Sequence, residues 1–191
     1  MKKGTIIIIA VVAVLAILIG SVVSSYNSLA TAREEVAAAE SNIDTYLQRR
    51  ADLIPNLVKT AKQYAAHETD VFDKVLEARE KLVGADTVSE KAEADAELSS
   101  ALQSFNLIVE NYPELTSNTT FIQVMDELAG SENRIATARK DYNDTVNEYN
   151  SKIIKFPTSL VAGMFGFEKA EYFEAAEGAE TTPDVDELFG E

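Results

Sequence analysis

The run TIIIIAVVAVLAILIGSVV, residues 5–23, decides the fold class, because it distinguishes this chain from a soluble helical protein. Its 19 residues carry no charge, whereas a helix in a soluble core normally keeps a polar face. As an α-helix it would extend about 28 Å, close to the ~30 Å hydrocarbon core of a bilayer. We therefore predict a transmembrane anchor at residues 5–23, preceded by a short basic N-terminus at residues 1–4.

A cleaved signal peptide is the main alternative for this segment. The hydrophobic part of a signal peptide usually has ~7–15 residues and ends at an Ala-x-Ala-like site, whereas this one is longer and is followed by SVVSS at residues 21–25. We favour a retained, single-pass span. Lys2 and Lys3 precede it, and the next basic residue, Arg33, is followed by two glutamates. The positive-inside rule therefore predicts a cytoplasmic N-terminus and a domain on the extracytoplasmic side of the membrane.

The rest of the chain is strongly acidic. Thirty-two Asp and Glu residues face 17 Lys and Arg residues, and the net charge is −15. Lys2 and Lys3 are the only charged residues before Ser24, so the part beyond the span carries −17. Such a surface repels phosphate backbones, and we expect no nucleic-acid partner. Cysteine is absent, which excludes disulfides and thiolate metal sites.

From the end of the span onward, mainly apolar residues recur in alternating steps of four and three, which is an average period near 3.5 residues. The first stripe is Val22, Tyr26, Leu29, Arg33, Val36, Glu40, Ile43, Leu47 and Arg50, and the second is Ile54, Leu57, Ala61, Tyr64, Glu68, Val71, Val75, Ala78 and Leu82. The third is Ala94, Leu98, Ala101, Phe105, Ile108 and Tyr112, and the fourth is Phe121, Met125, Leu128, Glu132, Ile135, Arg139, Tyr142, Val146, Tyr149 and Ile153. This period predicts coiled-coil-like packing. Few glycines and prolines also favour helix, and the length suits one domain. The fold class is therefore all-α, with an antiparallel up-and-down four-helix bundle at residues 24–156.

Turn residues support this segmentation. Gly84 marks the end of the second helix, and Ser89 can cap the third. Pro113 disfavours helical geometry at the residue before it and so ends the third helix. Ser117 or Asn118 can then cap the fourth.

Pro55 leaves two alternatives. If Asp52 caps a new helix, Pro55 lies in the first turn, where a missing N–H costs nothing. If the helix continues, Pro55 is a kink and the domain has three long helices. We favour the boundary, and hence four helices.

The C-terminal part is less regular. Residues 157–173 form a short apolar segment containing two glycines, which either caps one end of the bundle, the reading we favour, or lies in the bilayer interface. Residues 174–191 are acidic, and we predict a disordered tail. Val185, Leu188 and Phe189 in it are either a short docking motif or part of a solvated tail without function, and we favour the latter.

Several sequence motifs resemble the LemA family. They are YNSL at residues 26–29, YLQRRADLIPNLV at 46–58, ENYPEL at 110–115, ENRI at 132–135 and FP at 156–157. The resemblance covers most of residues 26–173. It implies an N-terminally anchored bacterial membrane protein with an antiparallel helical bundle and no enzyme activity. The chain departs from the family pattern at Glu40, where Trp is usual, and at Thr116, where Lys is common.

Charged residues interrupt the apolar stripes. These candidates for an interior polar layer are Arg33, Glu40, Arg50, Glu68, Glu132 and Arg139. Three are basic and three acidic, so they can form interior ion pairs that set the helix register. Alternatively they lie at the edges of the stripes and reach water through their alkyl stems. The sequence does not decide between these readings.

Catalytic motifs are missing from the sequence. Di-iron bundles use Glu-x-x-His, but the one histidine, His67, has Tyr64 three residues before it. A metal site formed by the carboxylates of Glu68 and Glu132 is disfavoured. No serine, cysteine or second titrating residue lies at a spacing from His67 that would indicate a catalytic pair. We therefore expect no catalytic residues, no cofactor and no metal.

The sequence thus favours a non-enzymatic scaffold or interaction module at the cell envelope. Its expected partners are the lipid bilayer, through residues 5–23, and a protein of unknown identity. The alternative is a sensor-like bundle that binds a small ligand or cation between its helices. A pocket with a buried Glu68 or Glu132 would favour the sensor, and a filled core with an exposed apolar patch would favour the scaffold.

Overall fold

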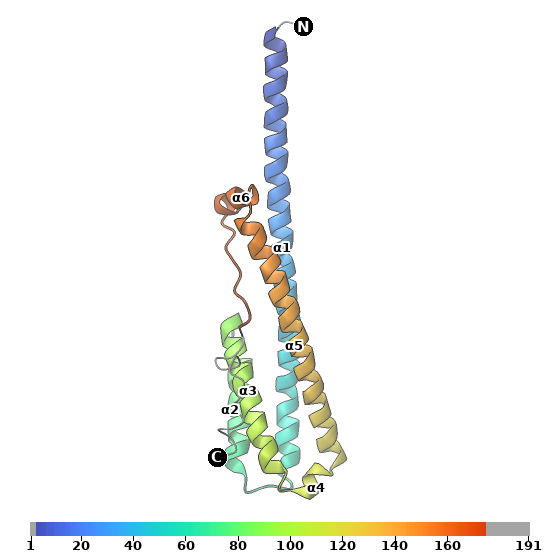
Figure 1. The fold of residues 1–191 in the computed structure, drawn as a ribbon. Helices are drawn as coiled ribbons and strands as arrows, with labels where there is room; N and C mark the ends of the chain where they lie inside the picture. The colour runs from blue at the N-terminus through green and yellow to red at the C-terminus, as the bar shows by residue number, and fades with distance from the viewer. Residues whose placement is uncertain (1–2, 175–191) are drawn as a thin grey trace, which may run out of the picture. The chain divides into compact units, whose positions relative to one another are not determined.

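The computed structural model describes residues 3–174, and that part of the chain contains helices and no strand (Figure 1). The helices are α1 (Lys3–Ala61), α2 (Thr69–Val83), α3 (Val88–Val109), α4 (Pro113–Thr116), α5 (Thr119–Ile154) and α6 (Thr158–Phe165). The prediction of an all-α protein that begins with a long apolar helix is confirmed.

The apolar start of α1 is uncovered by any other part of the described chain. The most apolar stretch of this helix contains no buried residue, and side chains such as Ile17 are 71% exposed. A core helix of a soluble protein would be covered by its neighbours. Within residues 3–174, α1 is the one helix whose length and composition suit a membrane span.

The predicted helix start at Pro55 is wrong, because α1 continues through Pro55 to Ala61. A proline inside a helix has no N–H for the carbonyl four residues earlier, which here belongs to Ala51. The side chain of Arg79 on α2 replaces that donor, with Nε 3.0 Å from the Ala51 oxygen. The carbonyl released by Pro55 is therefore satisfied by a tertiary contact that sequence spacing does not reveal.

The chain turns instead at residues 62–68. Gly84 follows the end of α2 as predicted, but Thr87, not Ser89, caps α3. Thr87 and Glu90 form a capping box, in which each side chain binds the other's backbone N–H. Asn118, one of the two predicted caps of the last long helix, accepts a hydrogen bond from the Phe121 N–H at 3.0 Å.

The chain divides into two compact units, and α1 and α5 each contribute a segment to both. The anchor unit is formed by residues 3–43 and 138–172. Its core contains Leu29, Ala32, Val36, Ile43, Ala138, Tyr142, Val146, Tyr149, Val161 and Ala162. Residues 166–172 are held along α5, because the Asn150 side chain makes two hydrogen bonds of 2.9 Å with the Ala170 backbone. The Tyr142 hydroxyl also donates to the Glu171 carbonyl at 2.9 Å.

The second unit, which we call the Arg50 unit, is formed by residues 44–137 with 173 and 174. Segments of α1 and α5 pack here with α2, α3 and α4. The core includes Leu47, Ile54, Leu57, Phe72, Val75, Leu98, Phe105, Leu115, Phe121, Leu128 and Ile135. The Phe105 ring packs between two other aromatic rings. Its centroid lies 6.0 Å from that of Phe72 and 6.3 Å from that of Phe121.

The third stripe was assigned partly to the wrong positions, although Ala94, Leu98 and Phe105 are buried as predicted. In α3 the buried residues include Leu98, Leu102, Phe105 and Val109, whereas the predicted Ala101 and Ile108 are only partly buried. The observed stripe runs through Asp95, Leu98, Leu102, Phe105 and Val109, and it keeps the same alternation of three and four. Two stripes of equal regularity overlap in this segment, and the one containing a buried charge is the one that packs.

The predicted boundaries of the C-terminal segments remain predictions. The domain limits of 24–156 and 157–173 are not decided by the helix bounds, although α6 lies within the second range. Most of the predicted tail, including Val185, Leu188 and Phe189, lies outside the described residues.

Candidate functional site

The most unusual side-chain cluster surrounds Arg50 in the Arg50 unit. The guanidinium Nη1 lies 2.5 Å from Asp95 Oδ1, and Nη2 lies 2.6 Å from Glu132 Oε2 and 3.0 Å from Ser99 Oγ. The Ser99 hydroxyl in turn donates to the Asp95 carbonyl at 2.9 Å. One cation thus joins three helices, since Arg50 comes from α1, Asp95 and Ser99 from α3, and Glu132 from α5.

Burial sets the energetics of this cluster. Arg50 is 4% exposed and Asp95 is fully buried, while the Glu132 side chain is 46% exposed. Burial lowers the pKa of Arg50 from its usual value, and the charge of Glu132 opposes that shift. A guanidinium remains charged under these conditions. Arg50 and Asp95 therefore form an ion pair out of water, and loss of Arg50 would leave the Asp95 carboxylate buried without its cation.

Sequence reasoning found two of these four residues and missed Asp95 and Ser99. Arg50 and Glu132 are members of the predicted polar layer, and the structure brings them together. Asp95 was missed because the third stripe was placed on Ala94 and Ala101. A signal was present: Asp95 lies three residues before Leu98 and ten before Phe105, at the alternating spacing of the other stripes.

Glu68 is placed elsewhere in the same unit, just before α2. Its Oε1 accepts a hydrogen bond of 2.6 Å from the Tyr112 hydroxyl, which raises the pKa of Tyr112. The Asn118 side chain donates to the Tyr64 hydroxyl at 3.0 Å. These two bonds tie the turn after α1 to the segments on either side of α4, so Glu68 serves a helix junction.

The other three candidates belong to the anchor unit. Arg33 is exposed, and its guanidinium carbon lies 5.5 Å from the ring centre of Phe167. Glu40 and Arg139 are half-buried. Burial, with smaller contributions from Glu40 and Glu171, raises the pKa of Tyr142 to about 12. The six charged residues are therefore distributed over several surroundings, and two of them, Arg50 and Glu132, form an ion pair.

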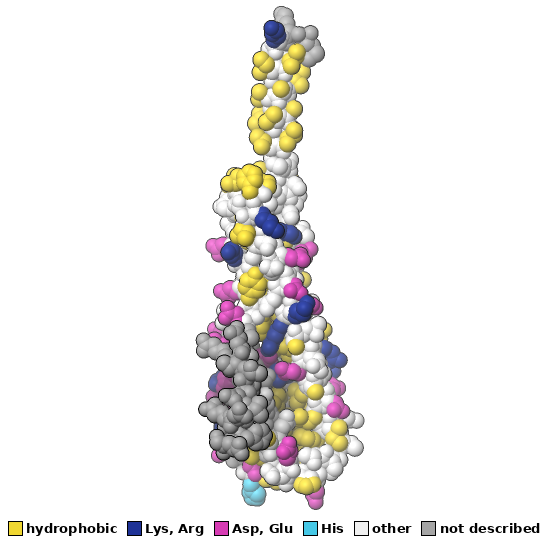
Figure 2. Space-filling model, in the orientation of Figure 1, with side chains coloured by type: hydrophobic (Ala, Val, Ile, Leu, Met, Phe, Trp, Pro, Cys, Tyr) yellow, Lys and Arg dark blue, Asp and Glu magenta, His cyan; other side chains and the backbone are white. Residues whose placement is uncertain are grey.

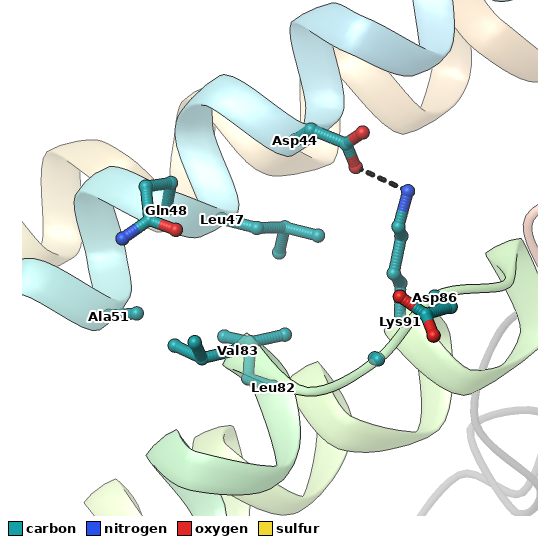
Figure 3. A pocket seen from close by; sticks show the side chains of 9 residues that line it. Asp44, Leu47, Gln48, Ala51, Leu82, Val83, Asp86 and Lys91 are labelled. Carbon is teal, nitrogen blue, oxygen red and sulfur yellow. Dashed lines mark ion pairs between the residues drawn. The ribbon is translucent and has the colours of Figure 1, made fainter.

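Two small pockets in the Arg50 unit are lined partly by residues of α1. One of about 280 Å³ borders the cluster and is lined by Arg50, Ser99 and Glu132 together with apolar side chains of α3 and α5. The other, of about 270 Å³, lies between α1 and the α2–α3 turn (Figure 3). There Leu47 and Leu82 face each other, and Lys91 Nζ pairs with Asp44 Oδ1 at 2.7 Å. Both volumes are at or below the small end of ligand sites.

This arrangement is an ion-pair network that connects α1, α3 and α5. Both Nη atoms of Arg50 have partners on α3 or α5, whereas its buried Nε has no hydrogen-bond partner among the described residues. Within residues 3–174 no group of three or more His, Asp or Glu residues is placed to hold a metal ion. His67 is exposed, in the turn before α2.

Comparison with known proteins agrees with the motifs. The model of the LemA family matches residues 39–186. The magnetosome protein MamQ 2 of Paramagnetospirillum magneticum is 33% identical over 99% of this chain and 80% of its own length. The magnetosome protein MamQ of Magnetospirillum gryphiswaldense is 29% identical over 100% of this chain and 80% of its own. Protein LemA of Metamycoplasma hominis is 26% identical over 85% of this chain and 74% of its own.

An all-helical domain that follows an uncovered apolar helix defines a membrane-associated helical protein. Within that class, the match over residues 39–186 shows that this chain belongs to the LemA family. The resemblance seen in the sequence motifs is thereby confirmed.

Proposed function

We propose that this protein is a non-enzymatic scaffold, in which residues 5–23 hold a helical domain at a membrane of the cell envelope and the domain binds a protein partner. The uncovered apolar start of α1 carries the proposal, because an apolar helix of this length needs a lipid environment. The Arg50 cluster supports it, since buried ion pairs that set helix register suit a rigid domain.

We further propose that the domain is an antiparallel up-and-down four-helix bundle. Within the anchor unit, the charge of Arg33 acts on Tyr149 and that of Glu40 on Tyr142. A step of seven residues forward along α1 thus corresponds to seven residues back along α5. This is the relation expected for antiparallel helices with a 3.5-residue repeat.

The proposed orientation places the N-terminus in the cytoplasm and the domain outside it. The chain has no cysteine, so a single introduced cysteine reports its own side of the membrane. In spheroplasts, an impermeant maleimide should label the exposed position of an Ala66→Cys variant. It should label a Gly4→Cys variant only after lysis. The opposite pattern would reverse the orientation.

In-cell photocrosslinking tests the scaffold. A photoreactive residue replaces an exposed apolar side chain of the full-length protein in the membrane, at Val83, Leu107 or Ile122, and trapped proteins are identified by mass spectrometry. A probe at the exposed, charged Lys74 is the matched control. A partner trapped reproducibly from one apolar position and not from Lys74 supports the scaffold. Trapping nothing at any position would contradict it.

A sensor that binds a small ligand or cation between helices is the second candidate. The pocket of about 280 Å³ beside Arg50 and Glu132 favours it. A ligand present at 100 times its dissociation constant stabilises the folded state by about 2.7 kcal/mol. Thermal unfolding of the full chain in detergent, with and without small-molecule fractions or divalent cations, should therefore show a raised midpoint if this function is correct, and no shift if the protein is only a scaffold.

A further inference from the structure

The anchor unit carries an apolar patch that no described residue covers. It consists of Ile154 and Phe156 at the end of α5, and Leu160, Met164 and Phe165 on α6. Phe156 is 80% exposed and Met164 is 74% exposed. Figure 2 shows apolar side chains gathered at the place of α6 and again along the start of α1. Large exposed apolar patches of this kind normally mark an interaction surface.

The patch has a defined orientation, because the opposite side of α6 is fixed to its own unit. Val161 and Ala162 are buried, whereas Leu160 and Met164 lie one turn apart on the exposed side. Gly166 ends the helix with φ 71°, a left-handed conformation that suits glycine, and the Phe167 N–H bonds the Ala162 carbonyl at 3.0 Å. α6 thus caps its unit with one face and leaves the other uncovered.

Contacts between aromatic rings show which part of α1 lies beside α6. The Tyr26 ring lies edge-on to Phe165 and Phe167, with centroids 5.0 and 5.6 Å away. Tyr26 comes three residues after the span, which is about 4.5 Å along the helix. The headgroup layer on each side of the hydrocarbon core is roughly 5–8 Å thick. Tyr26, and α6 beside it, therefore fall at the depth of the headgroups, where tyrosine is enriched in membrane proteins.

The charged residues close to the patch in sequence also suit the headgroup region of a bilayer. Residues 149–167 contain two lysines, Lys152 and Lys155, and no acidic residue, in a chain with 32 acidic residues. On α1, residues 5–32 carry no charge at all. The nearest acidic residue along the chain is Glu168, three residues after Phe165, whereas Lys155 is adjacent to both Ile154 and Phe156. The lysines can attract anionic lipids.

We propose that α6 and the adjoining Phe156 dock into the headgroup and upper acyl region of the same bilayer that holds α1, as a second, interfacial membrane contact. The patch adjoins the end of the span through the contact between Tyr26 and Phe165, so we take its partner to be lipid. The inference rests on residues 5–23 crossing the bilayer, as proposed above. The short apolar segment would then act both as a cap of its unit and as a membrane contact, which combines the two readings of residues 157–173.

A fluorescence measurement on the full chain tests this. Met164→Cys, labelled with an environment-sensitive NBD dye, is reconstituted in vesicles of phosphatidylethanolamine and phosphatidylglycerol. Val14→Cys reports the span, and Ala37→Cys, about 16 Å further along α1 than Tyr26, reports the aqueous side. Leu160→Cys repeats the measurement in case Met164→Cys disturbs folding, which circular dichroism checks.

We expect the probes at positions 164 and 160 to emit at shorter wavelength than the probe at 37. Spin-labelled lipids should quench them several-fold more strongly, and aqueous iodide several-fold less. Iodide quenching equal to that at position 37 would overturn the inference. Protection from iodide without quenching by lipid would also overturn it, because a protein or a second copy would then cover the patch. If the probe at 14 is itself unquenched by lipid, the span has failed, and the failure lies in the proposed function.

Discussion

Arg49 and Arg50 are neighbours in sequence and differ in surroundings. Arg50 is buried with Asp95, whereas Arg49 pairs with Glu127 at 2.8 Å and both of those side chains are about half exposed. Exposed ion pairs contribute little to the free energy of folding, because water and salt screen their attraction. Arg49 and Arg50, on the same turn of α1, therefore allow a buried and an exposed arginine to be compared within one protein.

The first prediction uses that comparison. Arg50→Met should lower the free energy of unfolding by about 3–5 kcal/mol, because it leaves the Asp95 carboxylate buried without its cation. Arg49→Met should cost less than about 1 kcal/mol. Denaturant unfolding in detergent, followed by circular dichroism, measures both. Equal losses for the two variants would mean that the Arg50 cluster is not a buried ion pair in solution.

The second prediction concerns Tyr142, whose pKa of about 12 is raised above the ordinary value of 10 mainly by burial. A raised folded-state pKa means that its stabilising contribution is complete below pH 10 and is lost as the pH rises from 10 to 12. Phenolate absorbance during an alkaline titration should show a late-ionising tyrosine among the seven. That late component should disappear in Tyr142→Phe. Its persistence in the variant would assign it to another tyrosine.

At the scale of the helix, periodicity predicted most of the buried face but not the helix ends. Leu29, Val36, Ile43 and Leu47 were placed on one stripe and are buried. The break expected at Pro55 lies at residues 62–68, because the Arg79 side chain supplies the hydrogen bond that proline cannot. Local rules identify where a helix is weakened, and a distant donor decides whether it breaks.

The third prediction follows from that contact. Arg79→Met should destabilise the protein by about 1–3 kcal/mol, because the Ala51 carbonyl loses its donor. In a Pro55→Ala background the loss should be smaller, since a backbone N–H is then available to that carbonyl. A double-mutant cycle on unfolding free energies measures the difference. Additive effects would show that Arg79 and Pro55 are energetically independent.

At the scale of the whole molecule, the fourth prediction concerns attachment to the membrane. Full-length protein should remain in the membrane fraction after alkaline and high-salt washing, because burial of the span in lipid does not depend on charge. A chain lacking residues 1–23 should be released by the same washes. Fractionation and immunoblotting compare the two. Recovery of the full-length protein in the soluble fraction would refute a retained span.

The sequence by itself determined the helical class, the apolar span, the family and most stripe positions, because these depend on composition and on periods within one segment. Only the tertiary structure decided that Arg50 meets Asp95, 45 residues away, and that α1 passes through Pro55. It also decided that α6 leaves an apolar face uncovered beside Tyr26. The physical reason is that the period of apolar residues identifies which side of a helix is buried. It does not identify the partner of a buried charge, of a released carbonyl or of an aromatic ring, because that partner depends on how helices distant in sequence pack together.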